Sequence, residues 1–478
     1  MKRVAGALCG LGLSLVSACT VGPNYRLPEA AIMNRSSAKG SFVGGSDSSV
    51  SGQPLPANWW RLYDEPALDA LIVEAIAANT DLRMADANLE HSRALVRVAR
   101  SLQQPSVSLG AGIEYAQLSG EQYLLPVAPP RSTLYDVDLN VGYNLDLFGG
   151  IRRGIEAAKA EDEAVEAARD LVRVNVVGQT TQAYVEVCGL GMWLNAARHS
   201  LQLQQESLGL THRLFEGGRA ISLDVVRSQQ LMNQLTTVIP SLEAAQRNAL
   251  YRLATLRGRP PSQFDHDLAV CSSPPRLEQP LPVSDGASLL RRRPDVRVAE
   301  RQLASASAQI GVATAQLYPN IAFGVGAGSV GAKSDAFTSP TNLWQLASIL
   351  EWQANQSAVR ARIAGANANA KLALAHLDGV VLKALADAES AMSVYAHDLE
   401  RESSARAARD DAAEAANEAQ TLQLRGRATA LAVLDAQRTL ASAESSLAEL
   451  ESAISEDQVA VFMALGGGWE SDANPSPS

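Results

Sequence analysis

The chain has 478 residues, with 41 basic and 51 acidic side chains and a net charge of −10. This acidic balance argues against nucleic acid as a partner. Aromatic residues make up only 5% of the chain, whereas alanine, glutamine, glutamate and arginine abound, so long helices are expected rather than a bulky apolar core.

The first residues predict an export signal at 1–18. Lys2 and Arg3 precede an apolar run and then small residues before Cys19, which is the pattern of a secretory leader. The stretch Val16-Ser17-Ala18-Cys19 also resembles a bacterial lipobox, in which Cys19 would become the lipidated first residue of the mature chain. A plain signal peptide that contains a cysteine is the alternative. No later stretch is apolar over the roughly 20 residues that a membrane helix needs, so a membrane crossing would have to use strands.

Cysteine usage leaves one open question. Of the four cysteines, Cys9 lies in the predicted signal and Cys19 is the candidate lipidation site. An exported protein meets an oxidising compartment, in which disulfides persist. Cys188 and Cys271 are therefore either a candidate disulfide or two separate buried thiols.

The first half of the mature chain is predicted to hold an extended segment, a helical stretch and a pair of strands. Residues 19–66 include a stretch rich in serine, glycine and proline and are predicted as a lipidated, extended N-terminal segment. Within 67–103, helix is predicted over Ala67–Ala78 and again over Asp81–Gln103, where apolar residues recur at helical spacing until Pro105 ends the helix. Alternating residues then predict strands over about 105–117 and 134–148, joined by a proline-rich loop.

The second of these strands alternates without a miss and is expected to have one wet face. Its apolar side begins at Tyr135, and its polar side carries Asp136, Asp138, Asn140, Asn144 and Asp146. Because a charge that faces lipid is costly, the polar side of a membrane strand is expected to face a water-filled lumen. For this segment taken alone, a half-buried strand of a soluble sandwich is the alternative.

Two long helices follow the strands. Residues 151–213 contain no proline and predict a helix of about 60 residues, roughly 90 Å long. Gly217 and Gly218, followed by Arg219, then predict a tight turn. A second helix over 220–257 returns antiparallel. These elements make up a first structural repeat over 67–262, and residues 263–290 are predicted as an irregular equatorial segment.

The chain then repeats itself. Asn79–Gly112 aligns without a gap on Arg293–Gly326, and Leu214–Gly258 aligns on Leu422–Gly466, which indicates a duplicated architecture. The second repeat is predicted over 291–466, with strands at about 319–331 and 342–353, helices at 294–316, 356–423 and 428–464, and a turn at Gly426 and Arg427. Residues 467–478 are predicted as a C-terminal tail.

These elements predict an α+β membrane protein whose barrel is shared between chains. Four strands cannot close a membrane barrel, because the smallest known barrel has eight, and an open sheet edge is not tolerated in lipid. Eight strands from two chains would fill their own interior, whereas twelve strands from three chains leave a lumen for the polar face. We therefore expect a homotrimer with a 12-strand β-barrel that continues into an α-helical barrel of antiparallel coiled-coil helices.

Four groups of motifs carry a family resemblance. Cys19–Tyr25, Leu145–Gly149, Arg291–Arg301 with Ile310–Pro319, and Gly426–Gln437 resemble, in that order, the start, the strand-to-helix junction, the start of the second half and the helical tip of outer-membrane efflux lipoproteins of the TolC/OprM (NodT) type. Together they span nearly the whole mature chain. The second strand-to-helix junction departs from the family: it reads Trp352–Arg360 where an aromatic residue followed by glycine and arginine is usual. The register of the fourth strand therefore stays open.

The resemblance implies a passive trimeric duct in the outer membrane, with a lipid anchor at its N-terminus. It would export drugs or small toxic compounds that a periplasmic membrane-fusion adaptor and an inner-membrane RND-type transporter deliver. The exposed turns at Gly217, Gly218, Arg219, Gly426 and Arg427 would dock the adaptor. Asp435 matches the family's tip carboxylate, which would form an anionic ring at the channel constriction, and Asp224 matches the carboxylate of the first half. The alternatives are a solvated helix residue for Asp435 and a helix-dipole acid for Asp224.

No enzymatic activity is expected. The six histidines have no metal-ligand spacing, and the sequence contains no serine or cysteine nucleophile signature and no glycine-rich phosphate loop. We therefore expect no metal and no cofactor apart from covalent lipid on Cys19. Two other functions stay open: an outer-membrane duct of a type I protein-secretion system, and a periplasmic coiled-coil protein without a pore, in which the strands would be surface hairpins.

Overall fold

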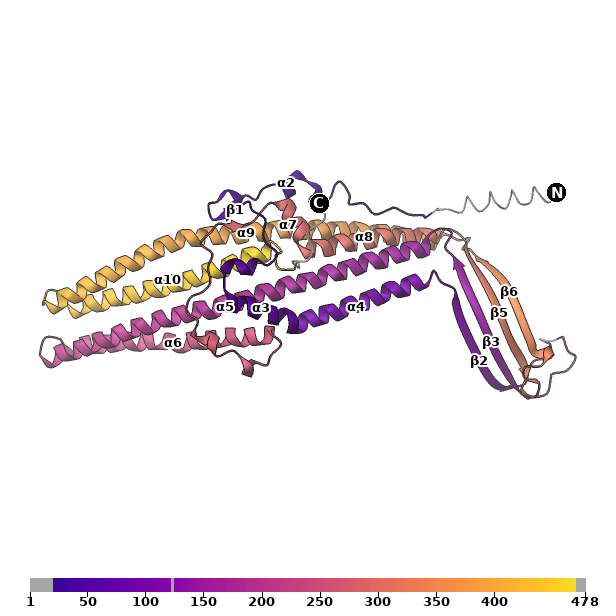
Figure 1. Cartoon of the computed structure of the whole chain (residues 1–478), viewed down its shortest axis with the longest axis horizontal. Helices are drawn as coiled ribbons and strands as arrows, with labels where there is room; N and C mark the ends of the chain where they lie inside the picture. The colour runs from indigo at the N-terminus through magenta and orange to yellow at the C-terminus, as the bar shows by residue number, and fades with distance from the viewer. Residues whose placement is uncertain (1–19, 122–123, 470–478) are drawn as a thin grey trace. The chain divides into compact units, whose positions relative to one another are not determined.

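The computed structural model describes residues 20–121 and 124–469, and Cys19 with the predicted signal lies outside this part. The contacts within the chain divide it into two compact units. The first, which we call the sheet unit, contains the described residues of 1–28, 89–165 and 298–377. The second, the hairpin unit, contains those of 29–88, 166–297 and 378–478. Several helices contribute residues to both units (Figure 1).

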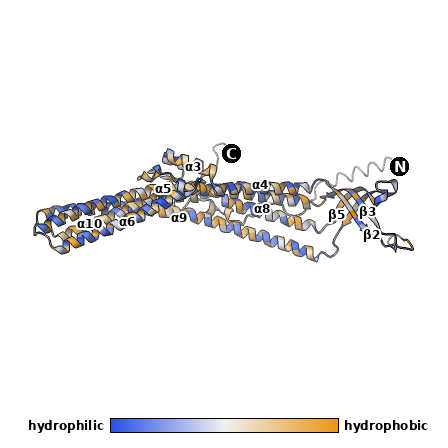
Figure 2. Ribbon diagram, turned by 90° about the horizontal axis from the view of Figure 1, so that it is seen from below, coloured by the Kyte–Doolittle hydropathy of each residue, from blue (hydrophilic) through white to orange (hydrophobic). Residues whose placement is uncertain are grey.

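The sheet unit contains one antiparallel sheet of four strands in the order β2-β3-β5-β6 (Figure 1). The strands are β2 (Ser106–Ala116), β3 (Ser132–Leu145), β5 (Asn320–Ala332) and β6 (Asn342–Glu351). Each lies within three residues of its predicted bounds. The register of the fourth strand, which the sequence left open, pairs Asn320 with Glu351 and Ser329 with Asn342. Figure 2 shows apolar residues gathered along these strands, whereas polar and apolar residues mix along the helices.

The helices predicted over 67–78 and 81–103 are α3 (Pro66–Ala78) and α4 (Thr80–Ser101). The break falls at Asn79, whose backbone is extended. Its side-chain oxygen accepts hydrogen bonds from the backbone N–H groups of Asp81 and Leu82. Asn79 therefore caps the start of α4, which is a role that asparagine fills well because its oxygen satisfies amides with no partner inside the helix.

Four long helices form two antiparallel hairpins. They are α5 (Gly150–Glu216), α6 (Ser222–Leu256), α9 (Ser357–Leu424) and α10 (Ala430–Ala464). Each lies within three residues of its predicted bounds, and Pro240 lies inside α6 without ending it. Among the described residues, no helix combines the length and the apolar character that a membrane span requires.

The segment predicted as irregular over 263–290 contains a helix that the sequence analysis missed. Asp285 caps α7 (Gly286–Arg292) by accepting a hydrogen bond from the Ser288 N–H, and α8 (Pro294–Ala315) follows directly. The break between α7 and α8 at Arg293 corresponds to the break at Asn79, since the two residues align in the repeat. The second repeat therefore begins at α7 rather than at residue 291, and α7 is the counterpart of α3.

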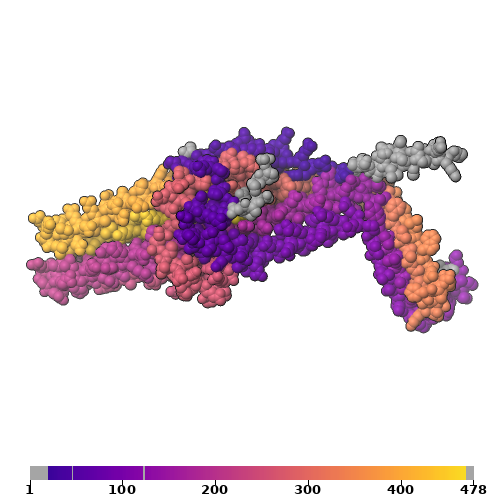
Figure 3. Space-filling view, in the orientation of Figure 1, coloured from indigo at the N-terminus to yellow at the C-terminus, as the bar shows by residue number. Residues whose placement is uncertain are grey.

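The N-terminal segment is extended with short helical turns, and part of it packs over the hairpin unit (Figure 3). Its strand β1 (Val50–Ser51) pairs in parallel with β4 (Leu281–Pro282). The short helix α2 spans Ser36–Lys39. The 3₁₀ turns of this segment are Ile32–Asn34, Gly44–Ser46 and Trp59–Tyr63. Elsewhere in the described residues, 3₁₀ turns include Pro261–Gln263, Asp267–Val270, Lys333–Asp335 and Ser339–Thr341.

An aromatic cluster lies in the core of the hairpin unit. The Trp59 ring is fully buried, and its centroid is 4.7 Å from that of Phe462 near the end of α10. Gly467 is needed here because a Cβ at this position would lie 2.8 Å from Trp59 Cδ1. The Trp469 Nε1–H donates to the backbone oxygen of Arg292. The first residues of the predicted tail therefore belong to the core, and residues 470–478 lie outside the described part.

Candidate functional site

The register of the sheet places most of the large apolar residues of the four strands on one face. Leu109, Leu139, Ala327 and Trp344 pair across β2, β3, β5 and β6, and residues directly opposite each other point to the same side. This apolar face includes Val107, Leu109, Ile113, Tyr115, Leu139, Val141, Tyr143, Ile321, Phe323, Val325, Trp344, Leu346 and Leu350. Most of these side chains are exposed in the isolated chain, with Val107 and Leu109 at 67% and 74%. An exposed apolar surface of this extent is typical of a face that contacts a membrane or another protein.

The opposite face carries polar and small residues, together with Val330, Leu343 and Ile349 towards β5 and β6. It carries four of the five predicted lumen residues, which are Asp136, Asp138, Asn140 and Asn144. Asn140 Nδ2–H donates to Asp138 Oδ2. Glycines on the neighbouring strands leave room for these groups: a Cβ on Gly110 would collide with the Asp138 carboxylate, and one on Gly326 would lie 2.8 Å from Asn140 Oδ1. This face can hold water along its length but has few side chains large enough to fill an interior.

Asp146 does not belong to this polar face, and its prediction as a lumen residue is wrong. It follows the end of β3, where its carboxylate accepts hydrogen bonds from the backbone N–H groups of Ile151 and Arg152, at 3.0 and 2.8 Å. The Arg152 side chain also forms an ion pair with Asp146 at 3.3 Å. Asp146 therefore satisfies the free amides at the start of α5, where a carboxylate also complements the helix dipole.

Tyr135 begins the apolar side of β3 but is only 7% exposed. Its hydroxyl lies 2.6 Å from Ser329 Oγ, donates to Thr341 Oγ1 and accepts from the Phe337 N–H. The connection between β5 and β6 thus folds over this end of the sheet. The alternation of β3 assigned the face of Tyr135 correctly, but nothing in it indicated the covering loop.

Aromatic rings gather where the strands meet the helices. Phe148 and Tyr318 stack with centroids 4.4 Å apart. Trp352 follows β6 and donates its Nε1–H to the Leu317 backbone oxygen. Tyr143, near the end of β3, is partly exposed on the apolar face. Aromatic side chains at this level are typical of the boundary between hydrocarbon and water.

The N-terminal segment is clamped to the same junction by Arg153. This side chain is only 3% exposed, and it donates to the backbone oxygens of Val21 and Gly22, both at 3.1 Å, and to Asn24 Oδ1 at 2.8 Å. It also forms an ion pair with Glu156 at 2.6 Å. We call Thr20–Tyr25 and Arg153 the N-terminal clamp.

Backbone packing and a phenol complete the clamp. The Val21 N–H donates to the Phe148 backbone oxygen. Gly22 has a φ of +88°, and a Cβ there would collide with the Gly311 backbone of α8. The Tyr25 hydroxyl donates to Glu300 at 2.5 Å, and burial followed by this hydrogen bond raises the pKa of Tyr25, so the phenol stays protonated. The clamp fixes the first described residue, Thr20, beside Gly149.

Both tips of the hairpin unit end in the same glycine-dependent turn. Gly218 and Gly426 have φ values of +69° and +71°, and the next residues, Arg219 and Arg427, donate their backbone N–H to Leu214 and Leu422 five residues earlier. This is the Schellman arrangement, which favours glycine because a Cβ is strained at positive φ. Gly217 lies in the predicted turn but has no positive φ, so the turn requires glycine at 218 and not at 217.

The two tip carboxylates have different surroundings. Asp224 lies in the first turn of α6 and accepts a hydrogen bond from the Ile221 N–H at 3.2 Å, which is the helix-start role given as its alternative. Asp435 lies in the second turn of α10, is exposed, and forms an ion pair with Arg438 at 2.5 Å. In the single chain, the Asp435 charge is therefore partly neutralised.

Polar contacts between the two hairpins form a ladder that the sequence analysis missed. Ser207 Oγ–H donates to Gln437, Ser200 Oγ–H to Glu444, and Trp193 Nε1–H to Ser445 Oγ. These residues link α5 to α10 within the hairpin unit. Their only signal in the sequence is the recurrence of small polar residues at helix-facing positions, which is common in polar helices of any kind.

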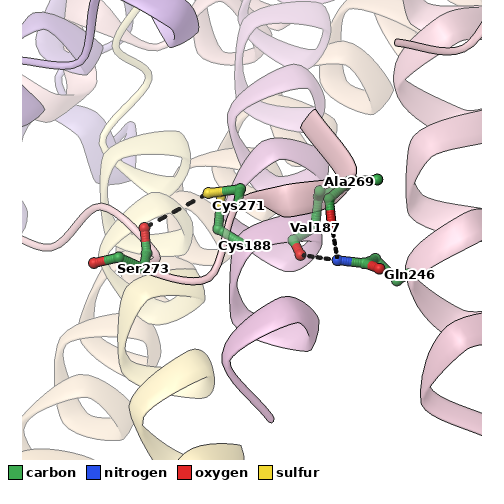
Figure 4. Close-up of a disulfide and its surroundings, with 6 residues drawn as sticks. All are labelled: Val187, Cys188, Gln246, Ala269, Cys271 and Ser273. Atoms are coloured by element: carbon green, nitrogen blue, oxygen red, sulfur yellow. Dashed lines mark hydrogen bonds between the residues drawn. A yellow bond between two sulfur atoms is a disulfide. The ribbon is translucent and has the colours of Figure 1, made fainter. Parts of the chain in front are cut away.

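Cys188 and Cys271 form a disulfide, with Cα atoms 4.7 Å apart. Cys188 is fully buried on α5, whereas Cys271 ends a 3₁₀ turn, so the bond ties the connection after α6 to α5 (Figure 4). Gln246 on α6 supports the same place by donating its Nε2–H to the backbone oxygens of Val187 and Ala269. Of the two alternatives left by the sequence, the structure has the bonded one.

Comparison with known proteins identifies the family. The model of the outer membrane efflux protein family matches residues 71–259 and 287–467, which is most of the chain. The chain belongs to the outer membrane efflux protein family. Its membership places it with outer-membrane proteins and confirms the predicted TolC/OprM (NodT) relationship.

Individual relatives and solved structures agree with this family. Nodulation protein T of Rhizobium leguminosarum bv. trifolii is 28% identical over 463 residues, which cover 95% of this chain and 96% of that protein. The pyoverdine export outer membrane protein OpmQ of Pseudomonas putida is 30% identical over 440 residues, covering 90% and 92%. The solved outer-membrane channel OprN is 33% identical with a TM-score of 0.87, covering 94% of this chain and all of that one. By their names OpmQ is an export protein and OprN a channel, and the fold of the chain is that of such outer-membrane channels.

Proposed function

We propose that three copies of this chain form one passive efflux duct. In this duct the four-stranded sheets join edge to edge into a 12-strand barrel across the outer membrane, and the helices form a tube in the periplasm. The observation that carries the proposal is the sheet itself: among the described residues, β2 and β6 have a neighbouring strand on one side only, and one face is mainly apolar while the other is mainly polar.

The number of chains, three, follows from the unpaired edges of the sheet and from the small side chains on its polar face. Each unpaired backbone group at a sheet edge costs several kcal/mol in hydrocarbon, so the edges must pair with another copy. Eight strands enclose an interior that side chains fill. The polar face of this sheet carries Gly110, Gly324, Gly326 and Gly328 among its small residues, and these cannot fill an interior. A barrel of twelve strands, from three chains, is therefore the smallest one in which this face can line an open lumen.

The helical tips would dock the periplasmic adaptor, which connects the duct to an inner-membrane RND-type transporter. The turns at Gly217, Gly218, Arg219, Gly426 and Arg427 are exposed, and both turns have the same backbone geometry. Two similar tips per chain would present six similar sites around a trimer. The cargo would be drugs or small toxic compounds; among relatives, the names toluene efflux pump and pyoverdine export protein are in keeping with small molecules.

The lipid anchor is part of the same proposal. Cys19 lies outside the described residues, but the residue after it, Thr20, is held at the level where the strands begin. Palmitate and diacylglycerol on Cys19 would therefore enter the bilayer beside the barrel. Loss of palmitate incorporation in Cys19→Ser would support lipidation, whereas unchanged incorporation would contradict it.

Neighbouring residues of β3 provide a sharp test of the sheet's orientation. Leu139 is on the apolar face and Asn140 on the polar face at mid-strand. An arginine that faces lipid at mid-bilayer costs about 2–4 kcal/mol, so Leu139→Arg should reduce the protein recovered in outer membranes. Asn140→Arg should insert normally and lower the conductance for cations. If both variants insert equally well, the assigned faces are wrong.

The assembly itself is tested on protein purified from outer membranes in detergent. The expected particle contains three chains and conducts ions in a planar bilayer. A conducting monomer would contradict the shared barrel, and a trimer that does not conduct would favour the coiled-coil alternative.

The tip carboxylates are proposed to form the channel constriction, with Asp435 as the main contributor and Asp224 as a weaker one. Three copies of Asp435 around the axis would favour cations and repel one another. Asp435→Ala should raise single-channel conductance. Asp410→Ala is a matched control, because Asp410 is also an exposed helix residue paired with a neighbouring arginine. Unchanged conductance of Asp435→Ala, or an equal increase in the control, would remove Asp435 from the constriction.

A further inference from the structure

The sheet unit contains a groove beside the N-terminal clamp that the duct function does not use. Its volume is about 450 Å³, and Tyr25, Arg100, Arg152, Lys159 and Arg301 are among the residues that line it. It lies between α4, α5 and α8, close to the level at which the strands begin.

The groove is positively charged although the whole protein is acidic. Four basic and two acidic side chains line it. Both acids are already bound, since Glu156 pairs with Arg153 and Glu163 with Arg301.

Two of the four basic side chains of the groove have no acidic partner among the described residues. In the part of the chain that the structure describes, Arg100 and Lys159 form no ion pair or side-chain hydrogen bond and are exposed. The groove therefore offers two uncommitted cations to an anion.

The basic side chains of the groove, Arg152 with its Asp146 partner included, lie near the ends of the strands. Arg100 is in the last turn of α4, six residues before β2, and Arg152 is in the first turn of α5. Lys159 is nine residues into α5, or about 14 Å along the axis at 1.5 Å per residue. Side chains on a helix tilt towards its N-terminus, which for α5 is the end that adjoins the sheet. If the strands cross the outer membrane, these groups lie at the depth of the lipid headgroups.

If Cys19 carries lipid, the N-terminal clamp indicates that this groove opens to the outside of the proposed tube. Tyr25 lines the groove and is six residues after Cys19. A lipid on Cys19 can reach the bilayer only from outside the barrel wall, and the clamp holds the intervening residues against α5 and α8. The cations of the groove therefore face surrounding lipid rather than the lumen.

Apolar surface continues from the groove along β2. Val107 and Leu109 follow Arg100 by seven and nine residues and are among the most exposed apolar side chains of the sheet. A ligand that carries a phosphate at one end and acyl chains at the other matches a cationic groove followed by an apolar strand.

We propose that this groove binds the headgroup of an anionic glycerophospholipid, such as phosphatidylglycerol, with its phosphate at Arg100 and Lys159 and its acyl chains along β2. The bound lipid would brace the junction between barrel and helices next to the covalent anchor. This proposal rests on the proposed function, because it requires the strands to lie in the outer membrane.

The test is native mass spectrometry of the purified full-length protein with added phosphatidylglycerol or zwitterionic phosphatidylethanolamine. The wild type should retain phosphatidylglycerol preferentially, and Arg100→Gln/Lys159→Gln should bind it about tenfold more weakly. Arg360→Gln/Lys371→Gln is the matched control, since it removes one arginine and one lysine that are exposed, lie in the first four turns of α9 and do not line the groove. The control should bind as the wild type does.

Three outcomes would overturn the assignment. Equal loss of lipid in the control would show a general surface charge effect, and no preference for the anionic lipid would remove the headgroup. Displacement of the lipid by millimolar inorganic phosphate would show a site for free phosphate instead. Conductance of the same samples separates this proposal from the duct: conducting protein without selective lipid binding refutes only the groove, whereas protein that does not conduct refutes the duct.

Discussion

Removal of the Arg153 guanidinium should release the N-terminal segment from the sheet unit. In the structure this buried group donates to two backbone oxygens, on Val21 and Gly22, and to the side-chain oxygen of Asn24. Its aliphatic part lies over Gly311 of α8. Arg153→Ala removes all of these contacts, while Glu156, the partner in the ion pair, is 42% exposed and can be solvated instead.

The expected magnitude follows from the three hydrogen bonds to the segment. Gly22 and Asn24 are exposed, so water can replace part of what is lost, and about 1 kcal/mol per bond is a suitable net value. The segment should therefore be held about 3 kcal/mol less tightly, which corresponds to a factor of about 100 in its opening equilibrium.

Hydrogen exchange followed by mass spectrometry measures this opening directly. The Val21 N–H, which donates to the Phe148 oxygen, should exchange about 100-fold faster in Arg153→Ala. Arg153→Lys keeps the charge but has one nitrogen for three acceptors, so its exchange should be intermediate. Arg152→Ala is the control, because Arg152 bonds to Asp146 and not to the segment. Unchanged exchange in Arg153→Ala, or equal acceleration in Arg152→Ala, would refute the clamp.

Three further predictions concern stability. Burial, and then the neighbouring Asp398, raise the pKa of Asp457 from 3.8 to about 6. The folded protein is therefore more stable when this carboxyl is protonated, and that stability is lost as pH rises through 6. Asp457→Asn should raise the thermal midpoint of unfolding at pH 7.5 but not at pH 4. Gly218→Ala should lower the free energy of unfolding, measured by chemical denaturation, by about 1–2 kcal/mol because Gly218 has a positive φ. Gly217→Ala should leave it unchanged. Cys271→Ser opens a disulfide between residues 83 apart and should cost about 2–4 kcal/mol, with faster proteolysis of 263–285; equal proteolysis rates would contradict this.

Long, regular patterns were predicted well. Strict alternation assigned the strands and the sides of their residues, and the internal repeat placed the second half by analogy with the first. These patterns succeed because a two-residue or 3.6-residue period persists over many residues and one local exception does not erase it. The glycine turns at Gly218 and Gly426 were predictable for a related reason, since positive φ selects glycine.

Single-residue decisions were predicted poorly. The sequence placed a break between residues 78 and 81 but did not reveal that the Asn79 side chain caps α4. Asp146 leaves the alternation by one position to cap α5. The short helix α7 was missed because seven residues provide too few turns for a period to show. In each case the start of the helix depends on which backbone N–H groups lack a hydrogen-bond partner. The pattern of apolar and polar side chains does not indicate this.

The sequence by itself determined that this chain makes two-faced strands and long helices in two repeats, because periodicity and glycine placement are local properties. Only the tertiary structure decided which faces meet. The register between strands placed most of the large apolar residues on one side of the sheet. Arg153 binds a segment about 130 residues earlier in the chain. Cys188 on α5 forms a disulfide with Cys271, which follows α6. Such contacts join residues distant in the chain, and their energy comes from desolvation and hydrogen bonding that exist only once the chain is folded.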